Sequence, residues 1–276
     1  MKSGMHLDLL FSIAQEIRKD VVRMSSVARA AGVDASLSLV DVIVYLYWGF
    51  FNIDPKEPHF SGRDRFILGD MDGCSALYAV LARYGFFDRE QLWCYLRLGA
   101  VLQGTPDIRT PGIDAPATAH GFAAGIAVGM ARELQAKGSM GRVVCLLNRE
   151  QLFEEIVQNA FRSASMCRLG RMMFIITTNN PDEKEPLEYP SWLTEEMGGL
   201  GVKPFFLDGH SFSSLESFFS GVDWEDCRPK MLILHTRLGK GLPFIESNSQ
   251  QYKRMLTMSE SDLALSILEV KAADEE

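Results

Sequence analysis

The chain has 276 residues, of which 47% are hydrophobic and 23% charged, which is ordinary for a soluble globular protein and enough to bury the core of one large domain. Its formal net charge of −8 argues against a nucleic-acid partner, because binding to phosphate backbones requires a basic surface. The five cysteines are scattered and form no Cys-x-x-Cys pair, so we expect reduced core thiols and no catalytic cysteine.

Signals for export or membrane insertion are not evident in the sequence. Residues 1–10 lack the basic-then-apolar pattern of a signal peptide. The longest apolar run, residues 42–51, is broken by Gly49 and is too short to span a bilayer. We therefore expect a cytoplasmic protein without a membrane partner.

The first third of the chain has a helical pattern with polar breaks. Apolar residues at helical spacing predict a helix over residues 6–30, and a second helix is expected from about Leu39, after Ser36-Leu37-Ser38. A third helix is predicted over residues 75–84. The charged triplet 63–65 has two interpretations, a surface charge cluster or part of a sequence motif.

Residues 142–181 predict a strand–helix–strand unit. The apolar run 143–147 is typical of a buried strand, and a second such run covers residues 172–176. Between them, apolar residues four apart predict one face of a helix: Leu152, Ile156, Ala160 and Ala164. Polar residues, 148–150 and 177–181, follow both strands. Because ligands bind at the carboxyl ends of strands in open α/β sheets, we expect a site there.

The remaining segments complete an α/β pattern. Residues 118–131 predict an N-capped, Ala/Gly-rich helix that packs closely, and residues 205–210 predict a strand entering a turn. A further strand is expected over residues 231–236, and the tail 271–276 is expected to be frayed. The sequence shows no repeat or linker, so residues 1–276 are interpreted as a single domain.

Several short motifs occur in the order found in the transketolase family and resemble its sequences closely. They lie at residues 54–56, 63–68, 102–107, 126–131 and 205–210. The resemblance covers about residues 10–265 and only the N-terminal, diphosphate-binding half of a transketolase. It implies a three-layer, thiamine-diphosphate-binding α/β fold with a mostly parallel central sheet flanked by helices. It also implies a hetero- or homo-oligomer in which a separate C-terminal subunit supplies the pyrimidine-binding domain.

The family binds thiamine diphosphate and magnesium through Gly-Asp-Gly-Glu and an Asn about thirty residues later. This chain has Leu147-Asn148-Arg149-Glu150 and Asn180 at these places, so the resemblance implies Asn148 and Asn180 as weak magnesium ligands. Arg149 either replaces the metal by pairing with phosphate, or fills an empty site or points to solvent. Glu150 has a second interpretation, as an acidic residue in the first turn of a helix.

Other positions also depart from the family. Gly32, Asp72, Thr105 and Tyr252 stand where histidines are usual. Gly121-Phe122-Ala123 replaces Gly-Gln-Gly, and His120 precedes it. A carboxylate at Asp72 would repel a diphosphate. The candidate cofactor-binding residues are Asn148, Arg149, Glu150, Asn180, Gly121, His120, Asp72 and Thr105.

These departures leave three functions open, and no catalytic residue is assigned. In the first, the chain is an enzyme subunit that moves a ketol or related acyl unit with thiamine diphosphate in an atypical site. In the second, it is a non-catalytic structural or regulatory partner that retains the fold but not the cofactor. In the third, the pocket binds another anion through Arg149 or a helix N-terminus.

Overall fold

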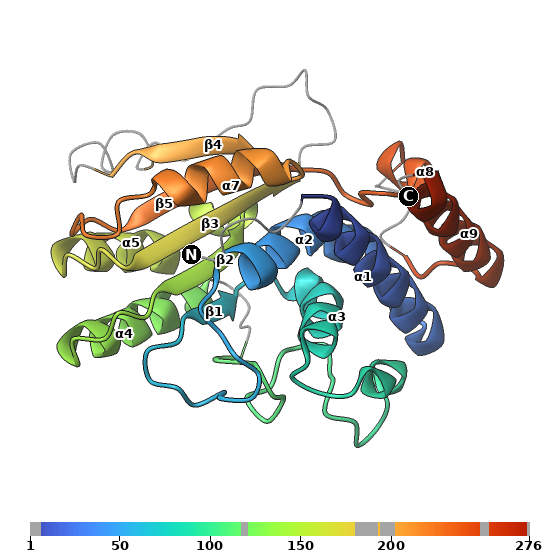
Figure 1. Ribbon diagram of the computed structural model, residues 1–276, viewed down its shortest axis with the longest axis horizontal. Helices are drawn as coiled ribbons and strands as arrows, with labels where there is room; N and C mark the ends of the chain where they lie inside the picture. The colour runs from blue at the N-terminus through green and yellow to red at the C-terminus, as the bar shows by residue number, and fades with distance from the viewer. Residues whose placement is uncertain (1–6, 117–120, 180–192, 194–201, 249–253, 275–276) are drawn as a thin grey trace.

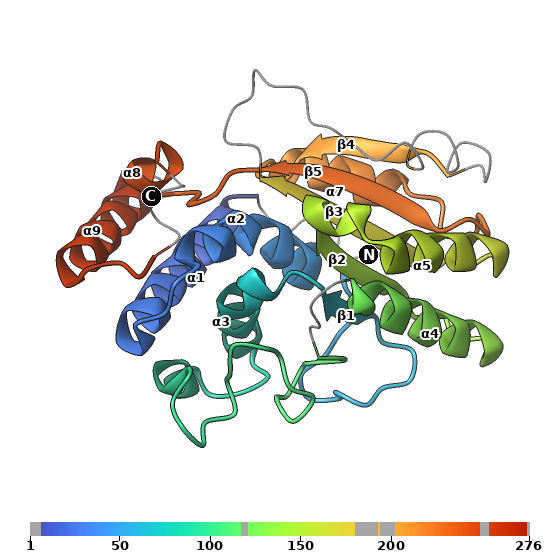
Figure 2. The same ribbon diagram turned by 180° about the vertical axis from the view of Figure 1, so that it is seen from behind.

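The computed structural model describes residues 7–116, 121–179, 193, 202–248 and 254–274. Their centre is a five-stranded sheet of order β1-β2-β3-β5-β4, in which every neighbouring pair is parallel. The strands are β1 (Arg65–Leu68), β2 (Val143–Asn148), β3 (Met172–Asn179), β4 (Pro204–Asp208) and β5 (Lys230–Thr236). Helices cover both faces of the sheet (Figure 1 and Figure 2), which confirms the predicted three-layer α/β architecture.

The central strands bury both of their faces, because successive side chains enter two separate apolar clusters. In β2, Val144 and Leu146 belong to one cluster, whereas Cys145 and Leu147 belong to the other. Strands buried on both faces have near-continuous apolar runs rather than alternating ones. Burial on both faces therefore explains why these strands could be predicted from apolar runs in the sequence.

The first face of the sheet is covered by helices whose apolar residues share one cluster. They are α1 (Leu7–Ala28), α2 (Val33–Val44), α3 (Cys74–Tyr84) and α7 (Phe212–Gly221). Helix α9 (Met258–Asp274) packs against α1, as both views show. The first and third predicted helices are confirmed, but the prediction of a frayed tail is wrong as far as Asp274.

The second helix differs from its prediction at both ends. Helix α2 begins at Val33, so residues 36–38 lie inside it, because Gly32 adopts the left-handed conformation (φ 81°) that turns the chain into the helix. It continues as the π-helix η1 (Tyr45–Phe50) and is not broken at Gly49. Within the described residues, this is the one helix long and apolar enough to cross a membrane, and 78% of it is buried, so core packing accounts for its hydrophobicity.

The second face of the sheet is covered by α4 (Phe122–Ala136) and α5 (Glu155–Met166). Helix α4 begins after Gly121 and extends farther than predicted. The helical stripe expected after β2 is interrupted, because the chain first forms the 3-10 helix η4 (Arg149–Phe153). Leu152 therefore lies buried in η4. Ala160 and Ala164 are buried in α5 as predicted, but Val157 and Phe161 complete its buried face in place of Ile156.

Strand β3 extends through polar residues that were expected to follow it. Thr177 and Thr178 are fully buried, and each hydroxyl donates to a backbone carbonyl of a neighbouring strand, Leu147 and Leu234 respectively, at 3.3 Å. These hydroxyls are satisfied inside the sheet, so the polar run does not mark the end of the strand.

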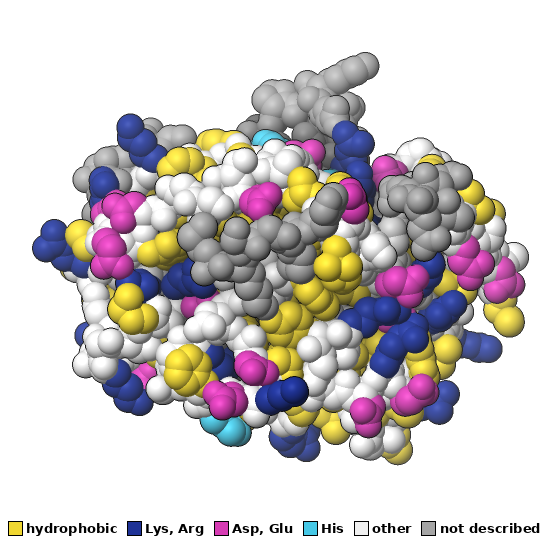
Figure 3. Space-filling view, viewed as in Figure 1, with side chains coloured by type: hydrophobic (Ala, Val, Ile, Leu, Met, Phe, Trp, Pro, Cys, Tyr) yellow, Lys and Arg dark blue, Asp and Glu magenta, His cyan; other side chains and the backbone are white. Residues whose placement is uncertain are grey.

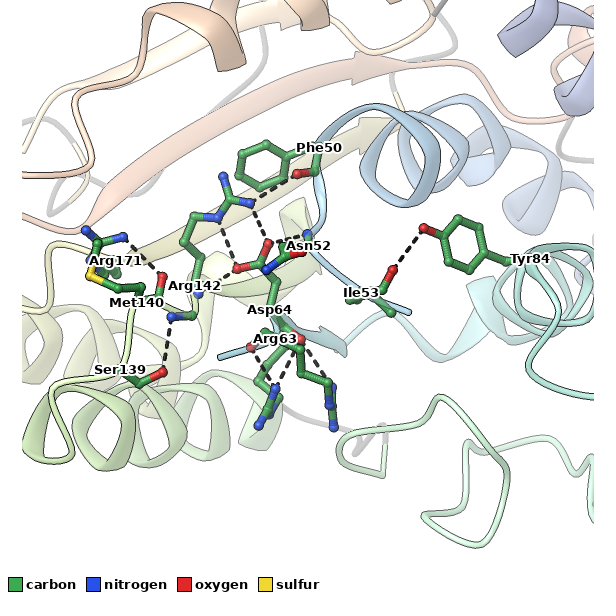
Figure 4. A network of polar contacts seen from close by, with 12 residues as sticks. Phe50, Asn52, Ile53, Arg63, Asp64, Tyr84, Ser139, Met140, Arg142 and Arg171 are labelled. Atoms are coloured by element: carbon green, nitrogen blue, oxygen red, sulfur yellow. Dashed lines mark hydrogen bonds and ion pairs between the residues drawn. The ribbon is translucent and has the colours of Figure 1, made fainter. Parts of the chain in front are cut away.

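The charged triplet 63–65 is a structural element at the amino edge of the sheet (Figure 4). Asp64 is 1% exposed, and its carboxylate accepts hydrogen bonds from the backbone N–H of Asn52 and from the guanidinium of Arg142. The Arg142 guanidinium also lies 3.8 Å from the centre of the Phe50 ring. The interpretation as a surface charge cluster is therefore wrong for Asp64, which joins β1, β2 and the end of η1.

Candidate functional site at the carboxyl edge of the sheet

The carboxyl ends of β1, β2 and β3 meet at one edge of the sheet. Leu68 pairs with Leu146, and Asn148 pairs with Thr177, so the residues that follow β1 and end β2 are neighbours. Asp70 lies two residues beyond the end of β1. The candidate residues Asn148, Arg149 and Glu150 are therefore placed at the edge predicted for a ligand site.

Asn148 caps the 3-10 helix η4 with a reciprocal capping box. Its Oδ1 accepts the backbone N–H of Gln151 at 3.1 Å, and its own N–H donates to Gln151 Oε1 at 3.0 Å. Gln151 is 8% exposed, and its Nε2 donates to the Gly69 carbonyl at 3.0 Å. The side-chain oxygen with which Asn148 would bind a metal is thus used to cap η4. Gln151, its partner in the capping box, also joins β2 to the end of β1.

Asp70 is the most buried carboxylate at this edge, 4% exposed. Its Oδ1 accepts the Asp72 N–H at 3.3 Å, which caps the 3-10 helix η2 (Met71–Gly73), and the side chain of Asn148 lies beside it. Burial raises the pKa of Asp70 to about 6, and the nearby carboxylates of Asp72 and Glu150 add to the rise. The edge therefore concentrates negative charge where a diphosphate would need positive charge.

The turn that carries Asp72 is held by hydrogen bonds from two helices. The Ser36 hydroxyl of α2 donates to the Asp72 carbonyl, and the Ser75 hydroxyl of α3 donates to Ser36 Oγ at 2.7 Å. Both serines are buried, whereas the side chain of Asp72 is exposed. The backbone of η2 is consequently held against two helices.

Side chains fill the space next to the backbone at two glycines, Gly69 and Gly121. Leu147 is fully buried, and a Cβ added at Gly69 would lie 2.6 Å from its Cδ2 and 2.9 Å from the Leu146 carbonyl oxygen. Gly121 adopts a φ of 74°, and a Cβ there would lie 2.3 Å from Val157 Cγ2. Gly121 is thus explained by the close packing of α5, and the backbone approach that glycines would give a diphosphate is occupied by side chains.

The structure brings together some of the predicted residues and separates others. Asp72, Asn148 and Glu150 lie close enough to Asp70 to affect its charge. Thr105 is exposed in a loop, and within the described part of the chain its side chain has no hydrogen bond to this cluster. His120 and Asn180 lie outside the described residues.

Two functional positions were missed from the sequence. Asp70 stands in the same non-matching segment as Asp72, but only the strand order shows that it adjoins Asn148. Asn179 ends β3, and its Oδ1 accepts the Thr236 hydroxyl at 2.8 Å. The pairing of Asn148 with Thr177 places Asn179 at this edge, because alternate residues of a strand share a face, and local sequence patterns do not contain that pairing.

A second polar cluster lies beyond the ends of β4 and β5. Asp41 Oδ2 accepts from Arg18 at 2.6 Å and from His210 Nδ1 at 2.8 Å, while the Arg237 N–H donates to His210 Nε2 at 2.9 Å. An accepting Nε2 makes His210 a neutral imidazole with its proton on Nδ1. Although burial acts to raise the pKa of Asp41, Arg18 and His210 lower it below its usual value. His210 is a positioning residue for the chain after β5, and it lies in the turn predicted at the end of residues 205–210.

These residues do not fit a magnesium–diphosphate group held in the family's manner. Asn148 contributes no charge and has its oxygen engaged, Leu147 fills the backbone approach, and the nearest carboxylate is buried. In the described part of the chain, no group of three or more His, Cys, Asp or Glu side chains is placed to hold a metal ion. Among the candidate residues predicted from sequence, the cation that lies at this edge is Arg149, which is half-buried.

Comparison with known proteins identifies the family. Residues 12–180 match the family described as "Transketolase, thiamine diphosphate binding domain". The chain is 24% identical over 265 residues to one of the subunits of the apulose-4-phosphate transketolase of Phocaeicola vulgatus, covering 95% of this chain and 94% of that protein. It is 29% identical over 267 residues to the 6-deoxy-6-sulfo-D-fructose transketolase subunit SqwG of a Clostridium species, covering 94% and 96%.

Solved structures show the same fold. The transketolase of Campylobacter jejuni superposes with a TM-score of 0.80 at 19% identity, covering 98% of this chain but 48% of that one. The Leishmania mexicana enzyme gives 0.76 at 17% identity, covering 96% and 45%. This chain therefore spans about half the length of these transketolases. It belongs to the transketolase family, in which it corresponds to an N-terminal, thiamine-diphosphate-binding-domain subunit.

Proposed function

We propose that this chain is the N-terminal subunit of a two-chain transketolase-type assembly and pairs with a separate subunit that carries the pyrimidine-binding half. The observation that carries the proposal is how much of each relative the chain matches. It covers 94% and 96% of two proteins named as transketolase subunits, but 48% of a single-chain transketolase. Because the chain matches those subunits along nearly their whole length, we expect it to work as they do, with the other half on another polypeptide.

Exposed apolar side chains support association with a partner. The segment 96–108 exposes four of them: Leu96, Leu98, Val101 and Ile108. Leu98 is fully exposed. On the face shown in Figure 3, acidic and basic side chains are interspersed and apolar side chains lie exposed between them. If the segment 96–108 lay at an interface between subunits, these four apolar side chains would be removed from water.

The names of the relatives favour one activity for the assembly, the transfer of a ketol or related acyl unit with thiamine diphosphate. Under this hypothesis the chain provides the diphosphate half of a shared site. The sugars in those names belong to those proteins, and sugar specificity in this assembly would come from residues that the present chain lacks or that its partner supplies.

The geometry of the carboxyl edge favours a second activity class, a non-catalytic partner. Asn148 is engaged as a helix cap, Asp70 and its neighbours make the edge negative, and Leu147 fills the approach to the backbone. A site built this way supplies neither the charge nor the space that a magnesium–diphosphate group needs. We conclude that the chain acts as the scaffold subunit of the assembly and does not itself hold the diphosphate.

Co-expression with a candidate C-terminal, pyrimidine-domain transketolase subunit from the same genome tests the proposal. We expect a stable complex by size-exclusion chromatography with light scattering, and no ketol transfer when thiamine diphosphate and magnesium are added. A chain that stays separate from that partner would contradict the assembly. Turnover that depends on the added cofactor would contradict the scaffold assignment and support the enzyme hypothesis.

A further inference from the structure

We propose that a cavity at the amino edge of the sheet binds a small aromatic anion, with its ring against Phe205 and Phe218 and its charge at Lys203. The cavity has a volume of about 600 Å³ and lies where β4 and β5 begin, at the opposite edge of the sheet from the candidate site. Binding there requires neither a partner subunit nor a diphosphate site, so it goes beyond the proposed function and stands or falls separately from it.

Three parts of the chain form the walls of this cavity: the start of β4, the end of α7 and residues 222–230. Helix α7 packs against β4 (Figure 1) and ends at Gly221, which lines the cavity. Small-molecule sites in proteins typically have volumes of roughly 300–1,000 Å³. This cavity is therefore large enough for a ligand with one or two rings.

Aromatic side chains provide much of the apolar lining. Phe205 of β4 and Phe218 of α7 meet edge to face, with ring centres 5.1 Å apart and an interplanar angle of 60°. Phe205 is 50% exposed although it lines the cavity, so the protein leaves part of its ring uncovered. An aromatic ligand would remove that surface from water and extend the edge-to-face pair. The apolar part of the lining thus favours a ligand with an aromatic body.

The charged residues of the lining favour an anion. Three cations and two anions line the cavity, a net charge of +1 in a chain whose net charge is −8. The Asp226 carboxylate is bound by the Arg228 guanidinium, whose Nη2 lies 2.8 Å from Oδ2. Asp223 Oδ1 accepts the backbone N–H groups of Glu225 and Asp226 at 2.9 and 3.4 Å, so it is turned towards its own loop. Because the protein engages both carboxylates, the charge offered to a ligand is positive.

Lys203 is the cation of the lining that is placed to contact a ligand. The ammonium group of Lys230 has three hydrogens, and it donates to the carbonyls of Gly170, Asp226 and Arg228 at 2.7–2.8 Å, so all of its donors are used. Lys203 is exposed, and within the described residues its side chain forms no ion pair. A carboxylate beside Lys203 would gain a charge-assisted contact.

The wall formed by residues 222–230 is fixed before any ligand binds. The three bonds of Lys230 hold it from inside. A Cβ added at Gly170 would lie 2.2 Å from the Asp226 carbonyl oxygen, so the segment packs directly on the backbone that follows α5. Trp224 packs on Phe50, with ring centres 5.5 Å apart. A preformed wall lowers the cost of binding, because little of the chain must be ordered.

Calorimetric titration of the full chain with three probes tests the proposal. Indole-3-acetate, indole-3-acetamide and tryptamine share one ring system but carry a negative, a neutral and a positive side group. We expect saturable binding of indole-3-acetate at submillimolar concentration, weaker binding of the amide and the weakest binding of tryptamine. Absence of saturable binding of indole-3-acetate at millimolar concentration would overturn the proposal, and so would equal or tighter binding of either of the other probes.

Variants of exposed residues locate the binding. Phe205→Ala should weaken binding of indole-3-acetate by at least about tenfold. Phe206→Ala is its matched control, because Phe206 is 49% exposed on the same strand but points to the opposite face, and it should change binding by less than about twofold. Lys203→Gln should weaken binding of the acetate by about two- to fivefold and leave the amide unchanged, whereas Lys56→Gln, an exposed lysine outside the cavity, should change neither.

Ser217→Trp gives an independent check. Ser217 is an exposed residue of α7 that lines the cavity, so a Trp there fills the cavity without altering the core. Far-UV circular dichroism and the thermal midpoint verify that each variant is folded. A folded Ser217→Trp chain should lose binding of indole-3-acetate. Wild-type affinity in folded Ser217→Trp or Phe205→Ala would place the ligand elsewhere and overturn the proposal.

Discussion

Replacing Asp64 by Asn is expected to destabilise the protein strongly, although Asp64 is far from the candidate site. The carboxylate is 1% exposed and accepts four hydrogen bonds. Three come from Arg142, through its backbone N at 2.7 Å, its Nε at 3.0 Å and its Nη2 at 2.5 Å, and one comes from the Asn52 N–H at 2.8 Å. An Asn side chain has one oxygen, so its NH₂ group would face donors and leave the part-buried Arg142 charge without a counter-ion.

The expected loss in unfolding free energy follows from this geometry. Removing one partner of a buried ion pair costs about 3–5 kcal/mol, because the other charge stays buried. In a chain of this size that corresponds to a fall of roughly 6–20 °C in the thermal midpoint. The control Glu133→Gln breaks an exposed helix pair with Lys137 and is expected to cost about 0.5 kcal/mol or less.

Urea denaturation followed by tryptophan fluorescence measures both variants. Trp224 is a local probe, because its ring lies 5.3 Å from the Arg142 guanidinium. The slope of the transition is expected to stay constant while the midpoint falls. If Asp64→Asn lost no more stability than Glu133→Gln, the argument that this network holds the amino edge of the sheet would be refuted.

Three further predictions concern the carboxyl edge. Burial raises the pKa of Asp70 to about 6 from an ordinary value of 3.8, so the contribution of this residue to the free energy of unfolding falls as the pH rises from about 4 to 6. In urea titrations, Asp70→Asn should be as stable as the wild type near pH 4 and more stable by up to about 3 kcal/mol at pH 7.5. A stability difference that did not grow with pH would contradict this prediction. Asn148→Ala should cost about 1 kcal/mol in the same assay through loss of the capping box, whereas Asn148→Asp should keep the cap; equal losses would argue against the capping role. His210→Leu removes the acceptor of the Arg237 N–H, so hydrogen exchange of that amide should accelerate by about tenfold or more, and unchanged protection would show that His210 does not position this segment.

The central strands β2, β3 and β5 could be predicted from sequence because they are buried on both faces. The apolar runs of β2, β3 and β5 are short and continuous and show no helical periodicity, so each strand was predicted within a few residues of its observed bounds. Helix ends were less predictable. The start of α2 depends on a left-handed Gly32, and η4 depends on a capping box whose partner, Gln151, also bonds a distant carbonyl.

The candidate site was predictable in place but not in chemistry. Asn148 and Glu150 follow a recognisable strand, so their position at the carboxyl edge could be inferred. The role of Asp70 could not, because it requires that β1 and β2 are neighbours and that the Asn148 amide is oriented by Gln151. A contact between residues 70 and 148 depends on the strand order, which local patterns in the sequence do not contain.

Crystallography of the assembled complex grown with thiamine diphosphate and Mg²⁺ tests the central claim most directly. We expect the carboxyl edge to show the Asp70 carboxylate bonded to the Asp72 N–H and the Asn148 Oδ1 bonded to the Gln151 N–H, with no diphosphate density in contact with this chain. An ordered diphosphate and metal held by Asn148, with Asp70 displaced, would contradict the account.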